Sequence, residues 1–209
     1  PNSMSMGGQL RPEMAQAHFE TIAAATDLPM ILFQYPAASG LGYPFETLLS
    51  LLDRITSIVA IKDWCSEPML HEKHSRTLPD LPRPVTVLTT HSAWLMSSLT
   101  MGAGGLLSGA GSVIADLQVA LFEAVQAKDL ACAQAINDRI YPMVQAFYAP
   151  PFLDMHNRMK ECLVLLGRLD KAVVRPPLMK LPADEIARLQ AALGEAGIGR
   201  EGALAEAAE

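Results

Sequence analysis

The sequence predicts an α/β fold in which parallel β-strands alternate with α-helices, followed by a helical C-terminal region. Between residues 12 and 112, short apolar runs alternate with amphipathic segments of helical length, which is the order expected of repeated β-α units. Each run is apolar nearly throughout rather than at every second position, as is typical of parallel strands buried on both faces. From Val113 onward apolar residues recur at helical spacing, so the sheet is expected to end before this residue.

Four strands are expected where apolar, β-branched runs meet turn residues or a polar end. Pro36 closes the first run, Lys62 ends the second, and the glycine-containing turn of residues 109–112 follows the last. The predicted strands are residues 29–36, 57–62, 85–89 and 104–108.

One helix is expected before the first strand, over residues 12–25, and others between the strands, over 44–55, 67–78 and 92–101. The first has apolar residues at helical spacing. Pro79 and Pro82 interrupt the chain after the third, and Ser92 is a candidate N-cap for the fourth. Residues 37–42 are expected to form a loop.

The C-terminal region is expected to be helical. Helical spacing extends over residues 115–148, with Lys128-Asp129 as the expected break between two helices. Further helices are predicted over 152–166 and 182–194, the latter with Asp184 and Glu185 in its first turn. Residues 197–209 are small and acidic and are expected to fray.

Composition restricts the kind of ligand. The chain has 209 residues, of which 50% are hydrophobic, so it can bury a substantial core. Its formal net charge of −6 and pI near 5.4, with no basic run, argue against nucleic acid or an anionic membrane as the main partner. We therefore expect a small-molecule ligand.

Cysteine usage and the N-terminal sequence predict a cytoplasmic protein. Cys65, Cys132 and Cys162 are odd in number and lack C-x-x-C spacing, which favours a reducing compartment. The first residues lack the basic-then-apolar pattern of a signal peptide, and no apolar run approaches membrane-spanning length.

The segment 58–63, Ile-Val-Ala-Ile-Lys-Asp, places an amine at the end of a strand otherwise suited to burial. Burial of a lysine is unfavourable unless the ammonium is paired or its pKa falls, and lysines of lowered pKa form Schiff bases with carbonyl substrates. If Lys62 faces the interior, then Ile58 and Ala60 do as well, and they can desolvate the amine. The alternative is a strand that simply returns to solvent.

Five segments support a more specific interpretation. In order, they are His18-Phe19 with Ile22-Ala23, the loop with Pro36 and Gly40, residues 58–63, residues 102–108, and Arg175-Pro176-Pro177-Leu178. Their order and spacing resemble the second half of the dihydrodipicolinate synthase and N-acetylneuraminate lyase family of class I, Schiff-base-forming aldolases and lyases.

The resemblance implies an eight-stranded (β/α)8 TIM barrel with a C-terminal helical extension. A complete barrel takes about 250 residues, so this chain is expected to hold about the last four βα units. The expected domains are 1–112, the C-terminal half of the barrel, and 113–209, the last barrel helix and the extension. The family's glycine-threonine-threonine motif, which binds the substrate carboxylate, belongs by this comparison to the other half.

The resemblance also assigns roles. Lys62 takes the position of the lysine that forms the Schiff base with pyruvate or another 2-oxo acid, and the resulting iminium can accept the electrons of the adjacent bond. Leu107 takes the place of the residue whose backbone carbonyl lines the pocket. Gly104, Gly105 and Gly109 allow close backbone approach there, although ordinary turn formation also explains these glycines.

The sequence departs from the family pattern at two positions. Phe33 replaces a tyrosine that relays protons in the family, and it can only contact substrate. Tyr35, two residues on and on the same face, is a candidate proton relay, the alternative being a tyrosine packed at the barrel mouth. Ala38 replaces the arginine of dihydrodipicolinate synthases, so condensation with aspartate semialdehyde is not expected. Ser39 is a candidate substrate ligand or a turn residue.

Three histidines and a tryptophan need separate interpretation. His91 ends the third predicted strand and is a candidate general acid, base or substrate ligand, or else lies outside the pocket beside Ser92. Trp64 could form a pocket wall for an aromatic or long-chain substrate, or pack against a helix. A metal at His71 and His74 is not expected, because no third ligand is evident and surface histidines explain the pattern.

We therefore expect a 2-oxo-acid lyase or aldolase, with a hydratase-aldolase acting on an aromatic or sugar-derived 2-oxo acid as the favoured subtype. No metal or other cofactor is expected, and the resemblance implies a homo-oligomer, a dimer or tetramer. The competing hypothesis is a non-catalytic relative or oligomeric assembly module, with Phe33 and Ala38 as signs of lost chemistry.

Overall fold

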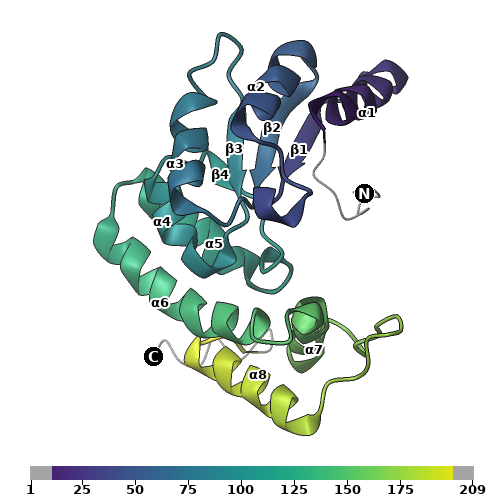
Figure 1. Ribbon diagram of the computed structural model, residues 1–209. Helices are drawn as coiled ribbons and strands as arrows, with labels where there is room; N and C mark the ends of the chain where they lie inside the picture. The colour runs from purple at the N-terminus through teal and green to yellow at the C-terminus, as the bar shows by residue number, and fades with distance from the viewer. Residues whose placement is uncertain (1–10, 200–209) are drawn as a thin grey trace. The chain divides into compact units, whose positions relative to one another are not determined.

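The computed structural model describes residues 11–199 and contains a four-stranded parallel sheet (Figure 1). The strands are β1 (Met30–Gln34), β2 (Ile58–Asp63), β3 (Thr86–Thr89) and β4 (Gly105–Leu106), and they pair in the order β1-β2-β3-β4. Each strand therefore lies beside its predecessor in the chain, as in successive βα units. The predicted number, order and parallel direction of the strands are confirmed, and their ends differ from the prediction by up to two residues.

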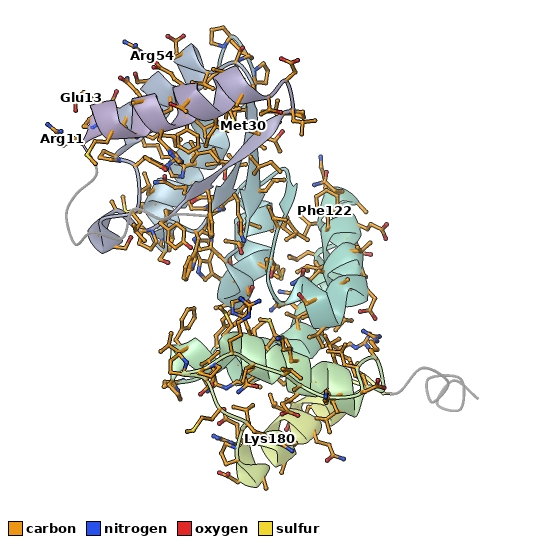
Figure 2. The ribbon with its side chains drawn as sticks, turned by 90° about the vertical axis from the view of Figure 1, so that its right-hand side faces the viewer. Arg11, Glu13, Met30, Arg54, Phe122 and Lys180 are labelled. Carbon is orange, nitrogen blue, oxygen red and sulfur yellow. The ribbon has the colours of Figure 1, made fainter. Side chains whose placement is uncertain are left out.

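A helix precedes the first strand and helices connect the strands, as predicted. They are α1 (Pro12–Ala25), α2 (Phe45–Arg54), α3 (Pro68–Thr77) and α4 (Leu95–Thr100), with short 3-10 turns η1 (Ala37–Ser39) and η2 (Ser92–Trp94). Proline begins α1 and α3, because its fixed φ suits the first helical turn and its missing N–H is not needed there. Figure 2 shows Arg11 and Glu13 at the start of α1, Met30 at the start of β1 and Arg54 at the end of α2.

The prediction that Ser92 caps a helix is wrong. Ser92 lies in η2, and α4 begins only at Leu95. The Ser92 hydroxyl instead lies 2.7 Å from both the Ser108 and the Tyr148 hydroxyls. These two partners are distant in sequence, so no local pattern could indicate them.

The chain divides into two compact units, which we describe separately. The first comprises residues 11–91 and 97–107 and contains the sheet. The second comprises residues 92–96 and 108–199 and is helical. No helix within residues 11–199 is long and apolar enough to cross a membrane.

The core of the first unit lies between one face of the sheet and α2. Leu32, Ile61 and Val87 are neighbours in the strand register and are each at most 1% exposed. They belong to the same apolar cluster as Leu48 and Leu51 of α2. Full burial of such a side chain contributes about 1.5–3 kcal/mol, so this layer fixes which strand face is turned to the helices. The next register row, which contains Lys62, faces the opposite side.

The second unit contains four longer helices: α5 (Gly111–Gln126), α6 (Leu130–Phe147), α7 (Met155–Leu165) and α8 (Ala183–Glu195), with the 3-10 turn η3 (Phe152–Asp154). The predicted break at Lys128-Asp129 is confirmed, since Lys128 has φ +59° and the Asp129 carboxylate accepts the Cys132 N–H at 2.9 Å. Glu185 of α8 forms a buried ion pair with Arg158 at 2.5 Å, in addition to its place in the acidic first turn.

Candidate active site

Lys62 lies near the C-terminal end of β2, in a row of residues that crosses the sheet. The register aligns Phe33 of β1, Lys62 of β2, Leu88 of β3 and Gly105 of β4. All four are partly exposed, whereas the residues of β1, β2 and β3 in the rows on either side are buried. Because the C-terminal ends of parallel strands form the ligand-binding edge of such sheets, this row is the natural place for an active site.

The Lys62 amine is partly desolvated. Burial lowers the pKa of Lys62 below its ordinary value of 10.5, because the charged form loses hydration. Its Nζ lies 4.3 Å from the centroid of the Phe33 ring, an interaction that favours the ammonium form. The net direction is downward, which increases the fraction of free amine available as a nucleophile.

Three aromatic side chains gather beside this amine. The ring centroids of Phe33 and Tyr35 are 4.3 Å apart, those of Tyr35 and Trp64 are 5.4 Å apart, and those of Phe33 and Trp64 are 6.4 Å apart. The structure therefore brings together Phe33, Tyr35, Lys62 and Trp64, which the sequence suggested separately. Tyr35 remains partly exposed, with its ring against Phe33.

The loop after β1 is folded tightly on itself. Ser39 Oγ donates to the Pro36 carbonyl at 2.6 Å and accepts the Leu41 N–H at 3.2 Å. Both contacts are turn hydrogen bonds of the kind serine commonly forms. A side chain at position 42 would run into the carbonyl of Tyr35, so glycine is required there.

Gly105 and Leu107 lie at the β4 end of the site. A Cβ added to Gly105 would meet Leu88 Cδ2 at 2.9 Å, so glycine permits close packing of β4 on β3. Leu107 is 41% exposed, and its N–H donates to the Thr89 carbonyl at 2.9 Å. The backbone at the β4 end of the site is thus held closely against β3.

A buried polar row lies one residue beyond Lys62, on the face turned toward the helices. Gln34, Asp63 and Thr89 are register neighbours, and each is 0% exposed. Gln34 clamps the Tyr43 backbone, donating to its carbonyl at 2.8 Å and accepting its N–H at 3.2 Å. Sequence analysis missed this row. The signal was present, because each of the first three apolar strands ends in a polar residue.

Asp63 is the centre of this polar row. Its Oδ2 lies 2.8 Å from His71 Nδ1 and 2.7 Å from His74 Nδ1, and its Oδ1 accepts the Cys65 N–H at 2.9 Å. Burial alone raises the pKa of Asp63, but hydrogen bonds from the two histidines outweigh it, so the pKa lies well below its usual range. Because an ionised carboxylate only accepts hydrogen bonds, both Nδ1 atoms carry the hydrogen.

The interpretation of His71 and His74 as surface histidines is wrong. Both are 0% exposed, and His71 Nε2 lies 2.5 Å from Ser98 Oγ. They are buried because α3 turns this face toward the sheet and Asp63 supplies the partner that buried imidazoles need. Two histidines separated by three residues lie on one helix face, but only the tertiary fold shows that this face is covered.

His91 is buried next to this cluster. It is 3% exposed, its Nε2 accepts the Ser66 N–H at 3.1 Å, and its Nδ1 lies 3.3 Å from Thr89 Oγ1. A ring nitrogen that accepts from a backbone N–H is unprotonated. Burial lowers the pKa of His91 to about 4, against a smaller upward effect of Asp63. The geometry lets His91 hold the loop that follows Lys62.

Asp63, Cys65 and His71 also have potential metal-ligand atoms within 4.8 Å of one another. Each of these atoms already has a protein partner: Asp63 accepts from His71, and Cys65 Sγ contacts the Glu67 carbonyl at 3.3 Å. Burial, with the nearby Asp63 charge, raises the pKa of Cys65 to about 12, whereas metal binding requires the thiolate. Hydrogen bonding therefore accounts for the cluster without a cation.

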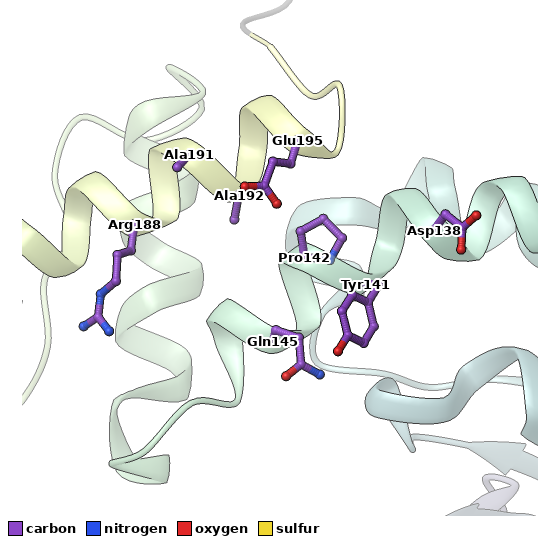
Figure 3. A pocket seen from close by; sticks show the side chains of 8 residues that line it. All are labelled: Asp138, Tyr141, Pro142, Gln145, Arg188, Ala191, Ala192 and Glu195. Atoms are coloured by element: carbon purple, nitrogen blue, oxygen red, sulfur yellow. The ribbon is translucent and has the colours of Figure 1, made fainter.

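A separate groove of about 600 Å³ lies in the helical unit (Figure 3). Helices α6 and α8 line it, with Asp138 and Tyr141 on one side and Arg188 and Glu195 on the other. It contains no residue from the strands and combines both signs of charge. It therefore has none of the features expected of a site for carbonyl chemistry.

Comparison with known proteins identifies the family. The model of the dihydrodipicolinate synthetase family matches residues 9–196. A 4-hydroxy-tetrahydrodipicolinate synthase of Kineococcus radiotolerans is 32% identical over 193 residues, which is 90% of this chain and 58% of the relative. Another, from Symbiobacterium thermophilum, is 31% identical over 183 residues, 87% of this chain and 59% of the relative.

Solved structures show the same fold. YagE of Escherichia coli, a prophage protein of the dihydrodipicolinic acid synthase family solved in complex with pyruvate, superimposes with a TM-score of 0.82 at 24% identity. The match covers 92% of this chain and 64% of YagE. The sheet and the helices that alternate with its strands are thus part of a (β/α)8 barrel, and the chain spans about three fifths of the length of these relatives.

The register of the sheet, the lysine near the end of β2 and the match over residues 9–196 lead to one conclusion: this chain belongs to the dihydrodipicolinate synthetase family.

Proposed function

We propose that this chain supplies the Schiff-base centre of a 2-oxo-acid lyase or aldolase, with Lys62 as the nucleophile. The observation that carries the proposal is the partly desolvated Lys62 amine in the row Phe33–Lys62–Leu88–Gly105. Relatives named as a 4-hydroxy-tetrahydrodipicolinate synthase and a putative 2-dehydro-3-deoxy-D-gluconate aldolase support it. Pyruvate bound in the YagE structure supports a small 2-oxo acid as the substrate class.

The chemistry follows from the amine. Neutral Lys62 Nζ attacks the C2 carbonyl of the oxo acid, and loss of water gives an iminium. The iminium accepts the electron pair of a bond to C3. Either the C4 hydroxyl loses its proton and the C3–C4 bond breaks, which releases C4 as an aldehyde and leaves C3 as the enamine carbon, or a C3 proton leaves. Reprotonation of C3 and hydrolysis of the iminium return the product and the free amine. Dehydration of a C4 hydroxyl uses the same C3 carbanion.

The remaining site residues have supporting roles in this proposal. Tyr35 is the proton relay, because its ring packs on Phe33, which contacts the Lys62 amine, and because its phenol carries the hydroxyl that Phe33 lacks. Gly105 and Leu107 present backbone to the substrate, and Phe33 contacts it. Ser39 contributes through the shape of its turn, and His91 through the loop that it holds. Residues 1–112 are proposed as the barrel part of the chain and 113–209 as the last barrel helix and extension.

The proposed acceptor differs from that of dihydrodipicolinate synthases. The loop over residues 35–43 contains no charged residue, so it offers no cation for a second carboxylate at Ala38. We also propose that the protein acts as a homo-oligomer without a metal or other cofactor. The competing proposal, a non-catalytic relative or assembly module, is favoured by one observation: Phe33 has no hydroxyl at the position that bears it in the family.

The proposal is tested by borohydride trapping of the protein with pyruvate, read by intact mass and peptide mapping. A reduced adduct on Lys62 is expected, and Lys62→Met should abolish it. Lys73→Met is the matched control, because Lys73 Nζ also lies over an aromatic ring, 3.8 Å from the Phe45 centroid, but on an exposed helix position. Folded protein that traps no 2-oxo acid, or traps one only at other lysines, would favour the non-catalytic relative.

A further inference from the structure

The rings of Phe33, Tyr35 and Trp64 form one continuous surface beside Lys62, which we call the aromatic wall. Their centroids form a triangle with sides of 4.3, 5.4 and 6.4 Å, all within the range of aromatic contact. Lys62 Nζ lies over the Phe33 member of the wall. A substrate attached to this nitrogen would therefore extend next to aromatic faces.

The wall is not part of the apolar core. The core of this unit lies on the other face of the sheet and contains none of the three rings. Each ring keeps part of its surface exposed. Aromatic side chains gathered next to a reactive group are a common lining of ligand sites.

Trp64 is held in place by its backbone. Its own N–H donates to the Gln34 carbonyl at 2.9 Å, the Cys65 N–H donates to Asp63 Oδ1 at 2.9 Å, and the Ser66 N–H donates to His91 Nε2 at 3.1 Å. Three consecutive backbone donors are thus fixed, and Ser66 has the unusual φ of +59°. These hydrogen bonds fix the backbone that carries Trp64, which reduces the entropy that this loop loses on binding.

The register row of Lys62 and the loop after β1 carry no charge other than that of Lys62 itself. The register neighbours of Lys62 on its face are Phe33, Leu88 and Gly105. The loop over residues 35–43 has no charged side chain, and the Ser39 hydroxyl is used within its turn. A polar or acidic distal group would lose hydration here without gaining a partner, whereas an aromatic ring would gain stacking and apolar contact.

We infer that Phe33, Tyr35 and Trp64 form a subsite for an aromatic ring, so that the substrate is an aryl-substituted 2-oxo acid rather than a sugar-derived one. This inference rests on the proposed function, because it takes the 2-oxo group to react at Lys62. The subsite binds the part of the substrate beyond C3, and Trp64 is its specificity-determining residue.

The test measures how well three 2-oxo acids compete with pyruvate for reductive trapping on Lys62 of the 209-residue chain. The three competitors are benzylpyruvate, 2-oxohexanoate and 2-oxoglutarate. Aromatic pairing adds about 0.5–1.5 kcal/mol beyond area burial, so half-saturation by benzylpyruvate is expected at about two- to twelve-fold lower concentration than by 2-oxohexanoate. Weakest trapping is expected for 2-oxoglutarate, which carries a second carboxylate.

Two variants isolate the aromatic contribution. Trp64→Leu keeps an apolar side chain but removes the ring, and it should bring the benzylpyruvate to 2-oxohexanoate ratio close to one. Phe152→Leu removes a partly exposed ring from η3 and should leave this ratio unchanged. Circular dichroism establishes that both variants are folded.

The outcomes separate the two proposals. Two results would overturn the aromatic subsite and leave the Schiff-base proposal standing. In the first, Lys62 traps pyruvate but shows no preference for benzylpyruvate over 2-oxohexanoate. In the second, this preference survives in folded Trp64→Leu. If no 2-oxo acid is trapped, the proposed function fails. The subsite is then tested by tryptophan fluorescence during titration with benzylpyruvate: saturable quenching lost in Trp64→Leu supports it, and its absence refutes it.

Discussion

Substitution of Asp63 by asparagine should strongly destabilise the sheet-containing unit. The fully buried carboxylate accepts hydrogen bonds from His71, His74 and the Cys65 backbone at 2.7–2.9 Å. Asparagine has one acceptor oxygen, and its NH₂ group would face N–H donors. Hydrogen bonds to a charged group contribute about 1.5–3 kcal/mol each, and a buried donor left without its partner costs about 1–3 kcal/mol. We expect Asp63→Asn to lower the free energy of unfolding by about 3 kcal/mol at pH 7.

The pH dependence of this difference tests its electrostatic origin. The folded pKa of Asp63 lies below the ordinary value of 3.8, so the stabilisation is complete above the unfolded pKa and is lost as the pH falls through the folded pKa. Urea unfolding followed by circular dichroism at pH 7, 5, 4 and 3 should give a constant difference from pH 7 to 5 that shrinks below pH 4. Asp53→Asn, on the exposed side of α2, should change stability by less than about 0.5 kcal/mol.

Two results would refute this reasoning. The first is a loss below about 1 kcal/mol for Asp63→Asn at pH 7, which would mean that the amide satisfies the same donors. The second is a difference that stays constant down to pH 3, which would exclude a contribution from the ionised carboxylate.

Three further predictions concern the residues around this cluster. His91 has a folded pKa of about 4 against an ordinary 6.5, so the protein should lose stability as the pH falls from 6.5 to 4, because only the unfolded chain takes up the proton in this range. Urea unfolding should show that His91→Gln flattens this pH dependence of the free energy of unfolding. An unchanged pH dependence in this variant would contradict the lowered pKa of His91. The Lys62 amine should react with acetic anhydride with a pH midpoint below 10.5, and a peptide-mapped midpoint at or above 10.5 would contradict its desolvation. Gly105→Val should destabilise by about 1–3 kcal/mol through the 2.9 Å approach to Leu88, whereas Gly194→Ala, with open space around it, should be neutral or stabilising in thermal unfolding.

Local patterns in the sequence predicted much of this architecture. Uniform apolar runs and turn residues located all four strands, and helical spacing located the helices, because both signals depend on neighbours within a few residues. The prediction of helix 12–25 agrees with α1 (Pro12–Ala25). Strand ends were less well predicted, because the hydrogen-bonded pairing of a strand stops where the neighbouring strand ends. The last strand, predicted over 104–108, pairs only at Gly105–Leu106.

The sequence alone therefore determined the parallel βα order, the family and the position of Lys62 near a strand end, since each is encoded in residues that are close together in the chain. Only the tertiary structure decided what surrounds that lysine. The register placed Phe33 beside Lys62 and Gln34 beside Asp63, and packing of α3 buried His71 and His74 on that carboxylate. These contacts join segments from different βα units, and whether a helix face is covered depends on the whole sheet rather than on its own sequence.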